Sequence, residues 1–351
     1  MRTTDNPQAG TVRYVDASAL EERTLAVLRE AGANEPSARA ATRALMHASR
    51  IGVDSHGVRL VAHYARALRG GRINGAPQIA VRRTGPAAAL VDADDGLGHL
   101  AAYRAMEEAC ALARENGVGA VGVCQSSHYG AAGAYALAAA EIGLIGLSTT
   151  NADAIVALHD GMAPFHGTNP IAAAAPVPGD RPWLLDMATS AIPMNRVHLY
   201  ATLGRELPEH VAADHTGQPT TNAALAEMLI PLGGADYGFK GAGLAGLVTI
   251  LSAVLTGAAP DPVMLPMTGT DDFATPRNVG HFCLALDPDH FVGRSTYDAL
   301  MAQYLAALRA SPTRSGATSL APGDREWMVE AERVTTGIPI DRETAAALSL
   351  P

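Results

Sequence analysis

The chain has 351 residues, enough for one large domain or two ordinary domains with a substantial core. Hydrophobic residues make up 48% and charged residues 17%, which is typical of a soluble globular enzyme. There are 26 lysines and arginines against 35 acidic residues, so the formal net charge is −9. No dense basic run occurs, which disfavours nucleic acid and anionic membranes as partners, whereas a small anionic substrate needs only one local cation.

The three cysteines, Cys110, Cys124 and Cys283, form no CxxC pair and lie in apolar sequence. We therefore expect buried free thiols and a reducing, cytoplasmic location, not disulfides or metal ligands. Residues 1–10 are polar and do not resemble a signal segment. No uncharged apolar run approaches the roughly 18 to 20 residues of a membrane span, so no membrane partner is expected.

The first 70 residues are expected to form a short strand, 11–15, and three helices. Ser18 and Glu21 form an S-x-x-E capping box, which predicts a helix to about residue 29. Asn34 predicts the cap of a second helix, which tolerates Pro36 in its first turn and runs to about residue 50. A third helix follows residues 55–56 and ends at 70–71.

Strands and helices alternate along the middle of the chain, and the two ends are mostly helical. This order predicts an α/β fold: a central α/β domain over 76–309, and a helical domain that residues 1–75 form together with 310–351. Residues 311–322 are rich in Ser, Thr, Pro and Gly and predict an exposed loop. The strands are predicted at 79–83, 88–92, 119–124, 144–149, 171–177, 183–187 and 282–287, and the helices at 103–115, 131–142, 244–256 and 291–308.

The sequence Asp54-Ser55-His56-Gly57 lies at the junction between two predicted helices. Histidine is the side chain best suited to exchange a proton near neutral pH, and a following glycine lets the backbone turn sharply. The competing interpretation is that Asp54 or Ser55 simply caps the next helix. Taken alone, these four residues favour the cap, but the motifs further along the chain favour the catalytic interpretation.

Two segments match G-x-G-x-x-G, and neither has the context of a Rossmann dinucleotide site. Residues 117–122 follow a helix and enter a strand, whereas the fingerprint requires a strand that leads into a helix. Residues 241–246 open a predicted helix behind Lys240, which leaves two alternatives. One is an anion site at the helix N-terminus, and the other is close helix packing through small residues.

Three loops at strand ends carry short polar side chains: 126–130, 167–170 and 186–190. Such loops commonly hold ligands, although each alone is equally consistent with turn chemistry. No G-x-S-x-G elbow or H-E-x-x-H motif occurs, which disfavours a serine hydrolase and a zinc protease. His159 and His166 flank a glycine turn without an evident third ligand, so no metal site is predicted.

Taken together and in order, these segments resemble the type-2 malate/L-lactate dehydrogenase family. The resemblance covers nearly the whole chain and rests on 54–58, 127–130, 167–170, 186–190, 231–241 and Gly337-Ile338. It implies a homodimeric NAD(P)-dependent oxidoreductase whose NAD(P)-binding central domain has a mixed sheet and is not a Rossmann fold. A cleft near the subunit boundary is implied as well.

The resemblance also implies roles for individual residues. His56 would give or take the proton, Ser55 would orient it, and Thr168, Met194 and Asn195 would lie at the substrate. The cofactor, NAD or NADP, would be lined by His128, Tyr129, Gly130, Ala131 and Ala132, by Asp186, Met187, Ala188, Thr189 and Ser190, by Phe239 and Lys240, and by Gly323, Asp324 and Arg325.

Two positions depart from the family pattern. Many relatives carry arginine four residues after the histidine, where this chain has Leu60, with Arg59 one place earlier and turned by about 100° on a helix. Arg196 stands where many relatives have lysine and cyclic-imine reductases can have aspartate. A cation there favours an open-chain 2-oxo or 2-hydroxy acid, so Arg59 and Arg196 are both candidates to hold the substrate carboxylate. The alternatives are a reductase of a cyclic 2-imino acid and, more remotely, an inactive interaction subunit.

Overall fold

The N-terminal segment forms strand β1 (Arg13–Val15) and helices α1 (Ala17–Glu30), α2 (Glu35–Arg50) and α3 (Val61–Gly70) in the computed structural model, which describes residues 12–350. The cap of α2 is confirmed, since Asn34 accepts a hydrogen bond from the Ser37 amide at 3.0 Å. The capping box of α1 is wrong. The Asp16 carboxylate caps this helix because it accepts the Ser18 amide at 2.8 Å and the Ser18 hydroxyl as well. Thr11 lies outside the described residues.

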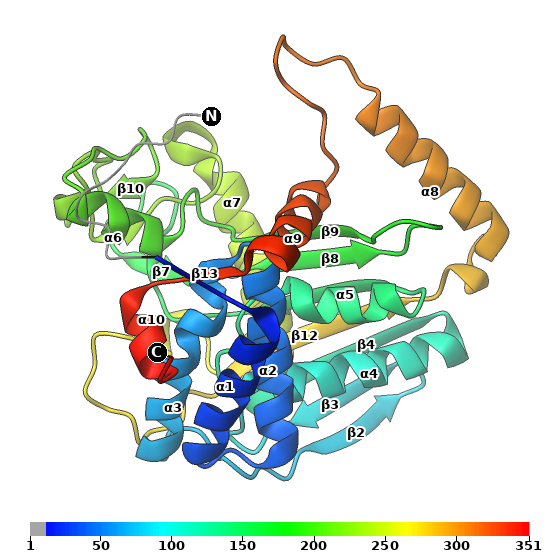
Figure 1. Cartoon of the computed structure of the whole chain (residues 1–351), viewed down its shortest axis with the longest axis horizontal. Coiled ribbons are helices and arrows are strands. Elements are labelled where there is room, and N and C mark those ends of the chain that lie inside the picture. Colours follow the sequence, from blue (N-terminus) through cyan, green and yellow to red (C-terminus); the bar gives the residue numbers. More distant parts are fainter. Residues whose placement is uncertain (1–11, 351) are drawn as a thin grey trace.

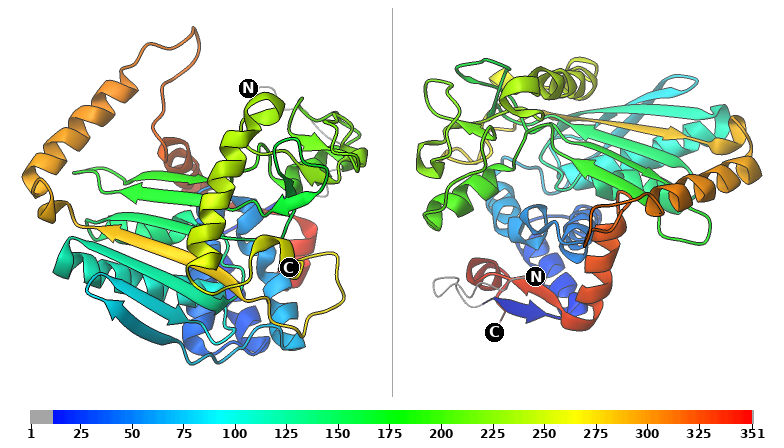
Figure 2. Two further views of the ribbon diagram at one scale, coloured as in Figure 1. Left: turned by 180° about the vertical axis from the view of Figure 1, so that it is seen from behind. Right: turned by 90° about the horizontal axis from the view of Figure 1, so that it is seen from above.

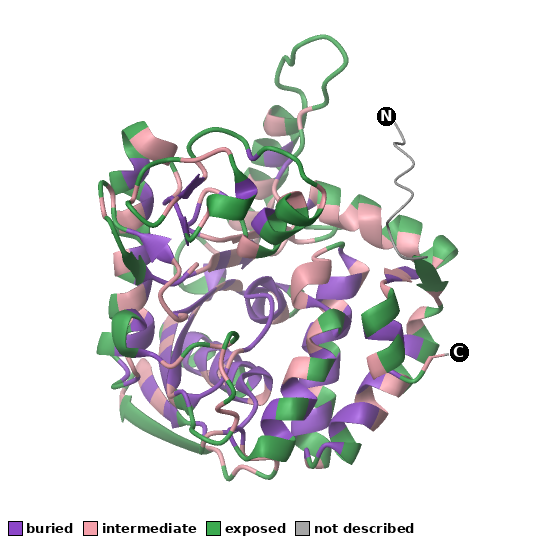
Figure 3. Ribbon diagram, turned by 90° about the vertical axis from the view of Figure 1, so that its left-hand side faces the viewer, coloured by how far each residue is buried: buried purple, intermediate pink, exposed green. Residues whose placement is uncertain are grey.

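The two ends of the chain pack together as one helical layer, as the alternation predicted. Helix α9 (Asp324–Thr336), strand β13 (Ile338–Ile340) and helix α10 (Arg342–Ala347) close the chain, and β13 pairs antiparallel with β1. Ile338, Ile340 and Leu348 share one apolar core with α1, α2 and α3. This layer covers one face of the central sheet (Figure 2), and its helices show one buried and one exposed face (Figure 3).

The central sheet has seven strands in the order β2-β3-β4-β12-β5-β8-β9. Only the β3–β4 pair is parallel, so the predicted mixed sheet is confirmed. Strands β4 and β5 are joined by helix α5 (Gly133–Glu141), yet β12 lies between them and is antiparallel to both. This insertion rules out a doubly wound parallel sheet. The strands are β2 (Ala80–Gly85), β3 (Ala88–Asp92), β4 (Val118–Ser126), β5 (Ile145–Thr150), β8 (Ile171–Ala175), β9 (Trp183–Met187) and β12 (Val279–Leu286).

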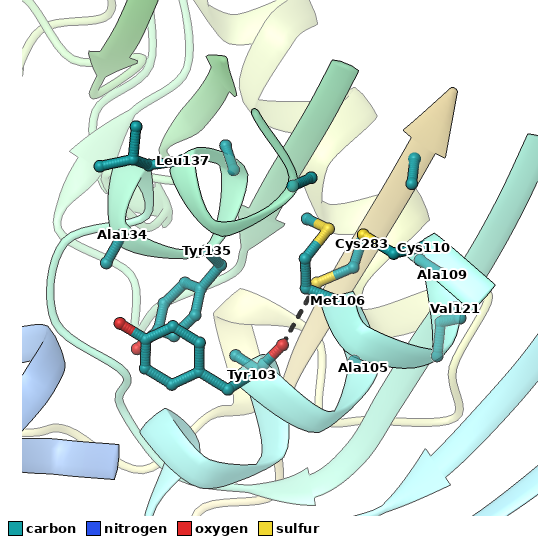
Figure 4. Packing of buried hydrophobic residues seen from close by; sticks show 14 of the residues in the cluster. Tyr103, Ala105, Met106, Ala109, Cys110, Val121, Ala134, Tyr135, Leu137 and Cys283 are labelled. Atoms are coloured by element: carbon teal, nitrogen blue, oxygen red, sulfur yellow. Dashed lines mark hydrogen bonds between the residues drawn. The ribbon is translucent and has the colours of Figure 1, made fainter. Parts of the chain in front are cut away.

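Helix α4 (Gly98–Asn116) and α5 pack on this sheet through small side chains and a few aromatic ones (Figure 4). A Cβ on Gly119 would lie 2.1 Å from the Ala109 carbonyl oxygen, and one on Gly146 would lie 2.5 Å from that of Ala136. Gly119, in the middle of the G-x-G-x-x-G match at 117–122, therefore lets strand β4 approach helix α4 closely. Its role is packing and not the binding of a phosphate. Cys110 and Cys283 are buried free thiols, as expected, and Cys124 is free but only partly buried.

A second, four-stranded sheet was not predicted. Its order is β10 (Ala212–Ala213), β11 (Met228–Leu229), β6 (Val156–Ala157) and β7 (Pro164–His166), and helix α6 (Met194–Thr202) adjoins it. Strands of two or three residues are too short to show an alternating pattern, so hydrophobic periodicity could not reveal them.

Helix α7 (Gly234–Thr249) continues as a π-helical segment, Ile250–Val254, and begins ten residues before the predicted position at 244. Gly241 therefore lies inside the helix, where a Cβ would meet the Leu232 carbonyl oxygen at 2.4 Å. Of the two alternatives for residues 241–246, the helix N-terminal anion site is wrong because the helix begins at Gly234. Close packing holds for Gly241 alone, since a Cβ on Gly243 would meet nothing within 4 Å. By length and composition alone, Gly234–Val254 is also apolar enough to cross a membrane, which the search for uncharged runs missed.

Helix α8 (Arg294–Arg309) follows β12 and lies at the outer edge of the molecule (Figure 1). The segment after it, 311–322, is an irregular and largely exposed loop, as predicted. This loop returns the chain to α9, the helix of the layer that lies beside strand β9 (Figure 1). Its course places residues 320–326 beside the central sheet, where three of the predicted cofactor segments meet.

Candidate active site

Asp54, Ser55 and His56 form a single 3-10 turn between α2 and α3. Neither this turn nor the next one, Val58–Leu60, has a side-chain cap, so the interpretation of Asp54 or Ser55 as a helix cap is wrong. The Asp54 carboxylate instead forms a two-point ion pair with Arg333 of α9, at 2.6 and 2.8 Å. The turn is thus held from outside and leaves Ser55 and His56 available.

Gly57 is required for packing. A Cβ on Gly57 would lie 2.2 Å from Ser49 Oγ, and this hydroxyl accepts the Val58 amide at 3.0 Å. Its φ of −89° is outside the left-handed region, so the reason for glycine is the close approach of the turn to α2. This close contact fixes the distance between α2 and the backbone at Gly57, directly after His56.

The Ser55 hydroxyl lies 2.9 Å from His56 Nδ1, which leaves Nε2 as the nitrogen for a substrate. A hydroxyl can donate to Nδ1 or accept from it. Ser55 can therefore orient the imidazole whether Nε2 carries a proton or an available lone pair. That property suits a group that gives a proton in one reaction direction and takes it in the other.

His128 faces His56 across the site, with ring centroids 5.9 Å apart. The Tyr64 hydroxyl lies 2.6 Å from His128 Nδ1 and fixes the ring. Both histidines are partly accessible, while Tyr64 and Tyr129 are fully buried. Sequence reasoning assigned His128 to the cofactor and missed Tyr64, for which the local sequence of α3 carries no distinct signal.

Burial lowers the pKa of His56 below the ordinary histidine value. The pKa of His128 is lowered much further, first by burial and then by the neighbouring His56 and His63. Both rings are therefore neutral at pH 7, and His56 is the easier one to protonate. Because two imidazolium ions this close repel each other, protonation of one ring opposes protonation of the other, and His56 is the ring that takes a proton more readily.

Two further histidines, His281 and His99, pack against Tyr129 and Tyr64, the two tyrosines that adjoin His128. His281 stacks on Tyr129 at 4.5 Å and forms 2.8 Å hydrogen bonds with the hydroxyls of Ser126 and Thr150. His99 packs edge-on against Tyr64. Burial lowers the pKa of each of these two histidines to about 3, so both are neutral. His281 acts as a hydrogen-bonding group, whereas the buried ring nitrogens of His99 have no hydrogen-bond partner among the described residues and the ring acts in packing.

Three predicted cofactor segments meet beside this cluster. The Gly133 amide donates to the Asp186 carboxylate at 2.8 Å, which joins the loop 128–132 to the segment 186–190. Residues 320–323 and Glu326 border Asp186 from the opposite side, around a cavity of about 310 Å³. Burial raises the pKa of Asp186 to about 6, and the nearby Glu326 contributes in the same direction. The remaining walls of the cavity are apolar: Ile51, Val53, Leu184, Leu185 and Leu320.

Thr168 lies on a loop that is tied to the same segment, because Thr189 donates to its carbonyl oxygen through both the amide, at 2.9 Å, and the hydroxyl. The next residue, Asn169, has a positive φ of 36°, which is unusual for a side-chain-bearing residue. Its amide nitrogen donates to the fully buried Asp261 at 2.7 Å, and this contact stabilises the unusual backbone.

Other predicted site residues among those the structure describes form no hydrogen bond or ion pair with His56, His128 or Asp186. Arg59 is mostly exposed and faces Asp341 at 3.8 Å, while Leu60 packs in the helical core. Asn195 and Arg196 are exposed in the first turn of α6, behind Met194. Lys240 and Phe239 lie on the exposed side of α7, with the Lys240 ammonium 5.0 Å from the Tyr237 ring centroid. Asp324 pairs with Arg309, and Arg325 points outward.

Within residues 12–350, no group of three or more His, Cys, Asp or Glu side chains has the arrangement of a metal site. The two histidines considered for zinc have other partners. His159 lies 3.6 Å from Asp160, and His166 lies 3.2 Å from Asp261.

The model of the malate/L-lactate dehydrogenase family matches residues 15–349. The chain belongs to this family. A malate dehydrogenase from Pyrococcus horikoshii is 36% identical over 330 residues, which cover 92% of this chain and 90% of that protein. A solved structure of malate dehydrogenase from P. horikoshii superposes with a TM-score of 0.87 at 31% identity and covers 99% of both chains. The resemblance seen in the sequence and the expected enzyme class are thereby confirmed.

Two further relatives show the range of this dehydrogenase family. A ureidoglycolate dehydrogenase (NAD(+)) from Escherichia coli K12 is 31% identical and covers 89% of this chain and 88% of that protein. A (2R)-3-sulfolactate dehydrogenase (NADP(+)) from Chromohalobacter salexigens is 34% identical and covers 92% of this chain and 93% of that protein. This member of the family is therefore an oxidoreductase acting on small hydroxy acids.

Proposed function

We propose that this dehydrogenase transfers a hydride between NAD or NADP and C2 of a small 2-oxo or 2-hydroxy acid, with His56 as the acid and base. The observation that carries the proposal is the Ser55–His56–His128 cluster, which presents one orientable imidazole three residues after Val53, a residue of the cavity wall. The choice of NAD or NADP is supported by two relatives, a ureidoglycolate dehydrogenase that uses NAD(+) and a sulfolactate dehydrogenase that uses NADP(+).

The cavity beside Asp186 fits part of such a cofactor. Its apolar walls suit a flat ring, and the carboxyl groups of Asp186 and Glu326 suit ribose hydroxyls better than a pyrophosphate. The segments 128–132, 186–190 and 320–326 would hold the cofactor, which supplies or accepts the hydride when bound. Lys240 would have to move from its position over Tyr237 to take part.

The protein's own contribution is the proton. During reduction, charge develops on the C2 oxygen, and protonated His56 delivers a proton to it from Nε2. During oxidation, neutral His56 in its Nδ1–H form removes the hydroxyl proton at Nε2, and Ser55 accepts the hydrogen bond from Nδ1–H before and after the transfer. His128, held neutral by burial and fixed by Tyr64, lines the opposite side and leaves the proton on His56.

Arg196 is the better of the two candidates to hold the substrate carboxylate. Arg59 already faces Asp341, whereas Arg196 has no ion pair among the described residues. Arg196→Ala is expected to raise the KM of the carboxylate substrate strongly with a smaller effect on kcat. An unchanged KM would rule out this role.

The function is tested by following NADH and NADPH oxidation at 340 nm with pyruvate, oxaloacetate and piperideine-2-carboxylate. We expect turnover of an open-chain 2-oxo acid with one of the two cofactors. Exclusive turnover of the cyclic imine would replace the proposal by an imine reductase. Failure to bind either cofactor at millimolar concentration would favour a non-enzymatic subunit.

We also propose a cytoplasmic homodimer that uses the exposed apolar face of α7. Large apolar side chains follow one another along this helix and its π-helical continuation, where Leu247 is 47% and Ile250 55% exposed. A second copy of the chain would cover this face. Light scattering coupled to gel filtration should give twice the chain mass for the wild type and the monomer mass for Leu247→Glu. A monomeric wild type, or membrane association of it, would contradict the proposal.

A further inference from the structure

Helix α9 connects the cavity beside Asp186 to the turn that carries His56. Its N-terminal end begins at Gly323, which borders the cavity, and its Trp327 indole donates to the Pro182 carbonyl oxygen at 2.9 Å just before β9. Near its C-terminal end, Arg333 reaches the catalytic turn. One rigid helix therefore touches both parts of the proposed active site.

The Arg333 guanidinium binds both the turn and the end of helix α2. Nη1 and Nη2 donate to the two carboxylate oxygens of Asp54, at 2.6 and 2.8 Å, and Nη1 also donates to the Ser49 carbonyl oxygen near the end of α2. The side chain of Arg333 is only 13% exposed, so its donors are directed inward. A two-point arginine–carboxylate pair fixes orientation as well as distance.

The turn has few other restraints on its outer side. Its own hydrogen bonds are His56 N to the Val53 carbonyl oxygen and Gly57 N to that of Asp54. Ser55 and His56 bond to each other and not to a neighbouring helix. Release of Asp54 would therefore loosen the outer side of the turn and the position of His56 relative to His128. The backbone on either side of the turn would still be held to α2 by Val53 N to the Ala48 carbonyl oxygen and by Val58 N to Ser49 Oγ.

We propose that Arg333 is a positioning residue of the reaction: it clamps Asp54 and Ser49, and so holds His56 at the site from α9, the helix that borders the cofactor cavity. This inference rests on the proposed role of His56. It assigns a catalytic consequence to a C-terminal ion pair that touches neither substrate nor cofactor. Lysine at this position keeps the charge but loses the two-point contact.

The test compares Arg333→Gln, Arg333→Lys and Asp54→Asn with a matched control on the same helix, Glu330→Gln. Glu330 forms a 2.6 Å ion pair with Arg181, away from the turn. We expect Arg333→Gln and Asp54→Asn to lower kcat at least tenfold with cofactor Kd changed less than threefold. Arg333→Lys should recover part of the loss, and Glu330→Gln should behave as the wild type.

Hydrogen–deuterium exchange of residues 52–58 supplies a measurement that does not need activity. Exchange should be faster in Arg333→Gln and Asp54→Asn, and unchanged in Glu330→Gln. Unchanged exchange in these two variants would overturn the clamp, as would a normal kcat with only a lower Tm. A wild type that reduces no substrate, but whose turn loosens in Arg333→Gln, would refute the proposed function and leave the clamp itself supported.

Discussion

His56→Gln should lower kcat by about 10²- to 10⁴-fold while the affinity for the cofactor changes little. This range is typical for the loss of a positioned general acid or base. Glutamine retains similar volume and a hydrogen bond for Ser55, but it cannot carry the proton. Stopped-flow measurement of NAD(P)H oxidation gives kcat, and the change in cofactor fluorescence on binding gives Kd.

The pH dependence of the wild type provides the second half of this prediction. Because burial lowers the pKa of His56, the neutral form dominates at pH 7, and oxidation of the 2-hydroxy acid should lose its rate only at a pH below the ordinary histidine pKa of 6.5. Reduction needs the protonated form, so its rate should rise as the pH falls. His56→Gln should abolish both dependences.

His290→Gln serves as the matched control, since His290 lies near Asp287 at the far end of β12. Activity within twofold of the wild type is expected there. Full activity in His56→Gln, or an equal loss in His290→Gln, would remove His56 from the mechanism. A larger loss of kcat in His128→Gln than in His56→Gln would assign the role of proton donor and acceptor to His128 instead.

Asp261→Asn should reduce the free energy of unfolding by about 3 kcal/mol, because it disrupts a buried charged hydrogen-bond network. The Asp261 carboxylate is fully buried and accepts hydrogen bonds from Asn169, Asn151 and Thr249 at 2.7 to 2.9 Å. The His166 ring and the Gly167 amide lie at 3.2 Å. The asparagine amide would direct a donor at groups that are themselves donors.

The direction in which the stability loss of Asp261→Asn changes with pH distinguishes a disrupted charged network from a simple packing defect. Burial by itself would raise the pKa of Asp261, but the hydrogen bonds from His166, Asn169 and Asn151 outweigh it and hold the pKa below its ordinary value. The stabilisation is thus present above the unfolded-state pKa near 4 and is lost as the pH falls through the folded-state value. The gap between wild type and Asp261→Asn should narrow in that acid range.

Urea unfolding at a series of pH values measures both effects. Asp160→Asn is the control, since it makes the same substitution at a carboxyl group that is 87% exposed. We expect a change below about 0.5 kcal/mol for this surface substitution. A loss of the same size in both variants, or a pH-independent gap, would contradict the network. The Asp261 variant should also raise KM, because Asn169 anchors the loop of Thr168.

The local chemistry of the sequence determined much of the fold. The Asn34 cap, the strand pair on either side of residues 85–86 and the alternating strands and helices correspond to α2, β2–β3 and the central sheet. Motif order was enough to identify the family, because six segments at matching spacing are specific even when each is ambiguous. Both G-x-G-x-x-G matches were correctly rejected as Rossmann fingerprints from their local context.

Only the tertiary structure decided which residues meet. Arg333 lies 279 residues from Asp54, and Asp261 lies 92 residues from Asn169, so no local pattern connects them. The outward positions of Arg59 and Lys240 likewise follow from packing, because a contiguous motif does not determine which way its side chains point. Local hydrogen bonding and periodicity are encoded within a few residues, whereas ion pairs and buried networks depend on how distant segments pack.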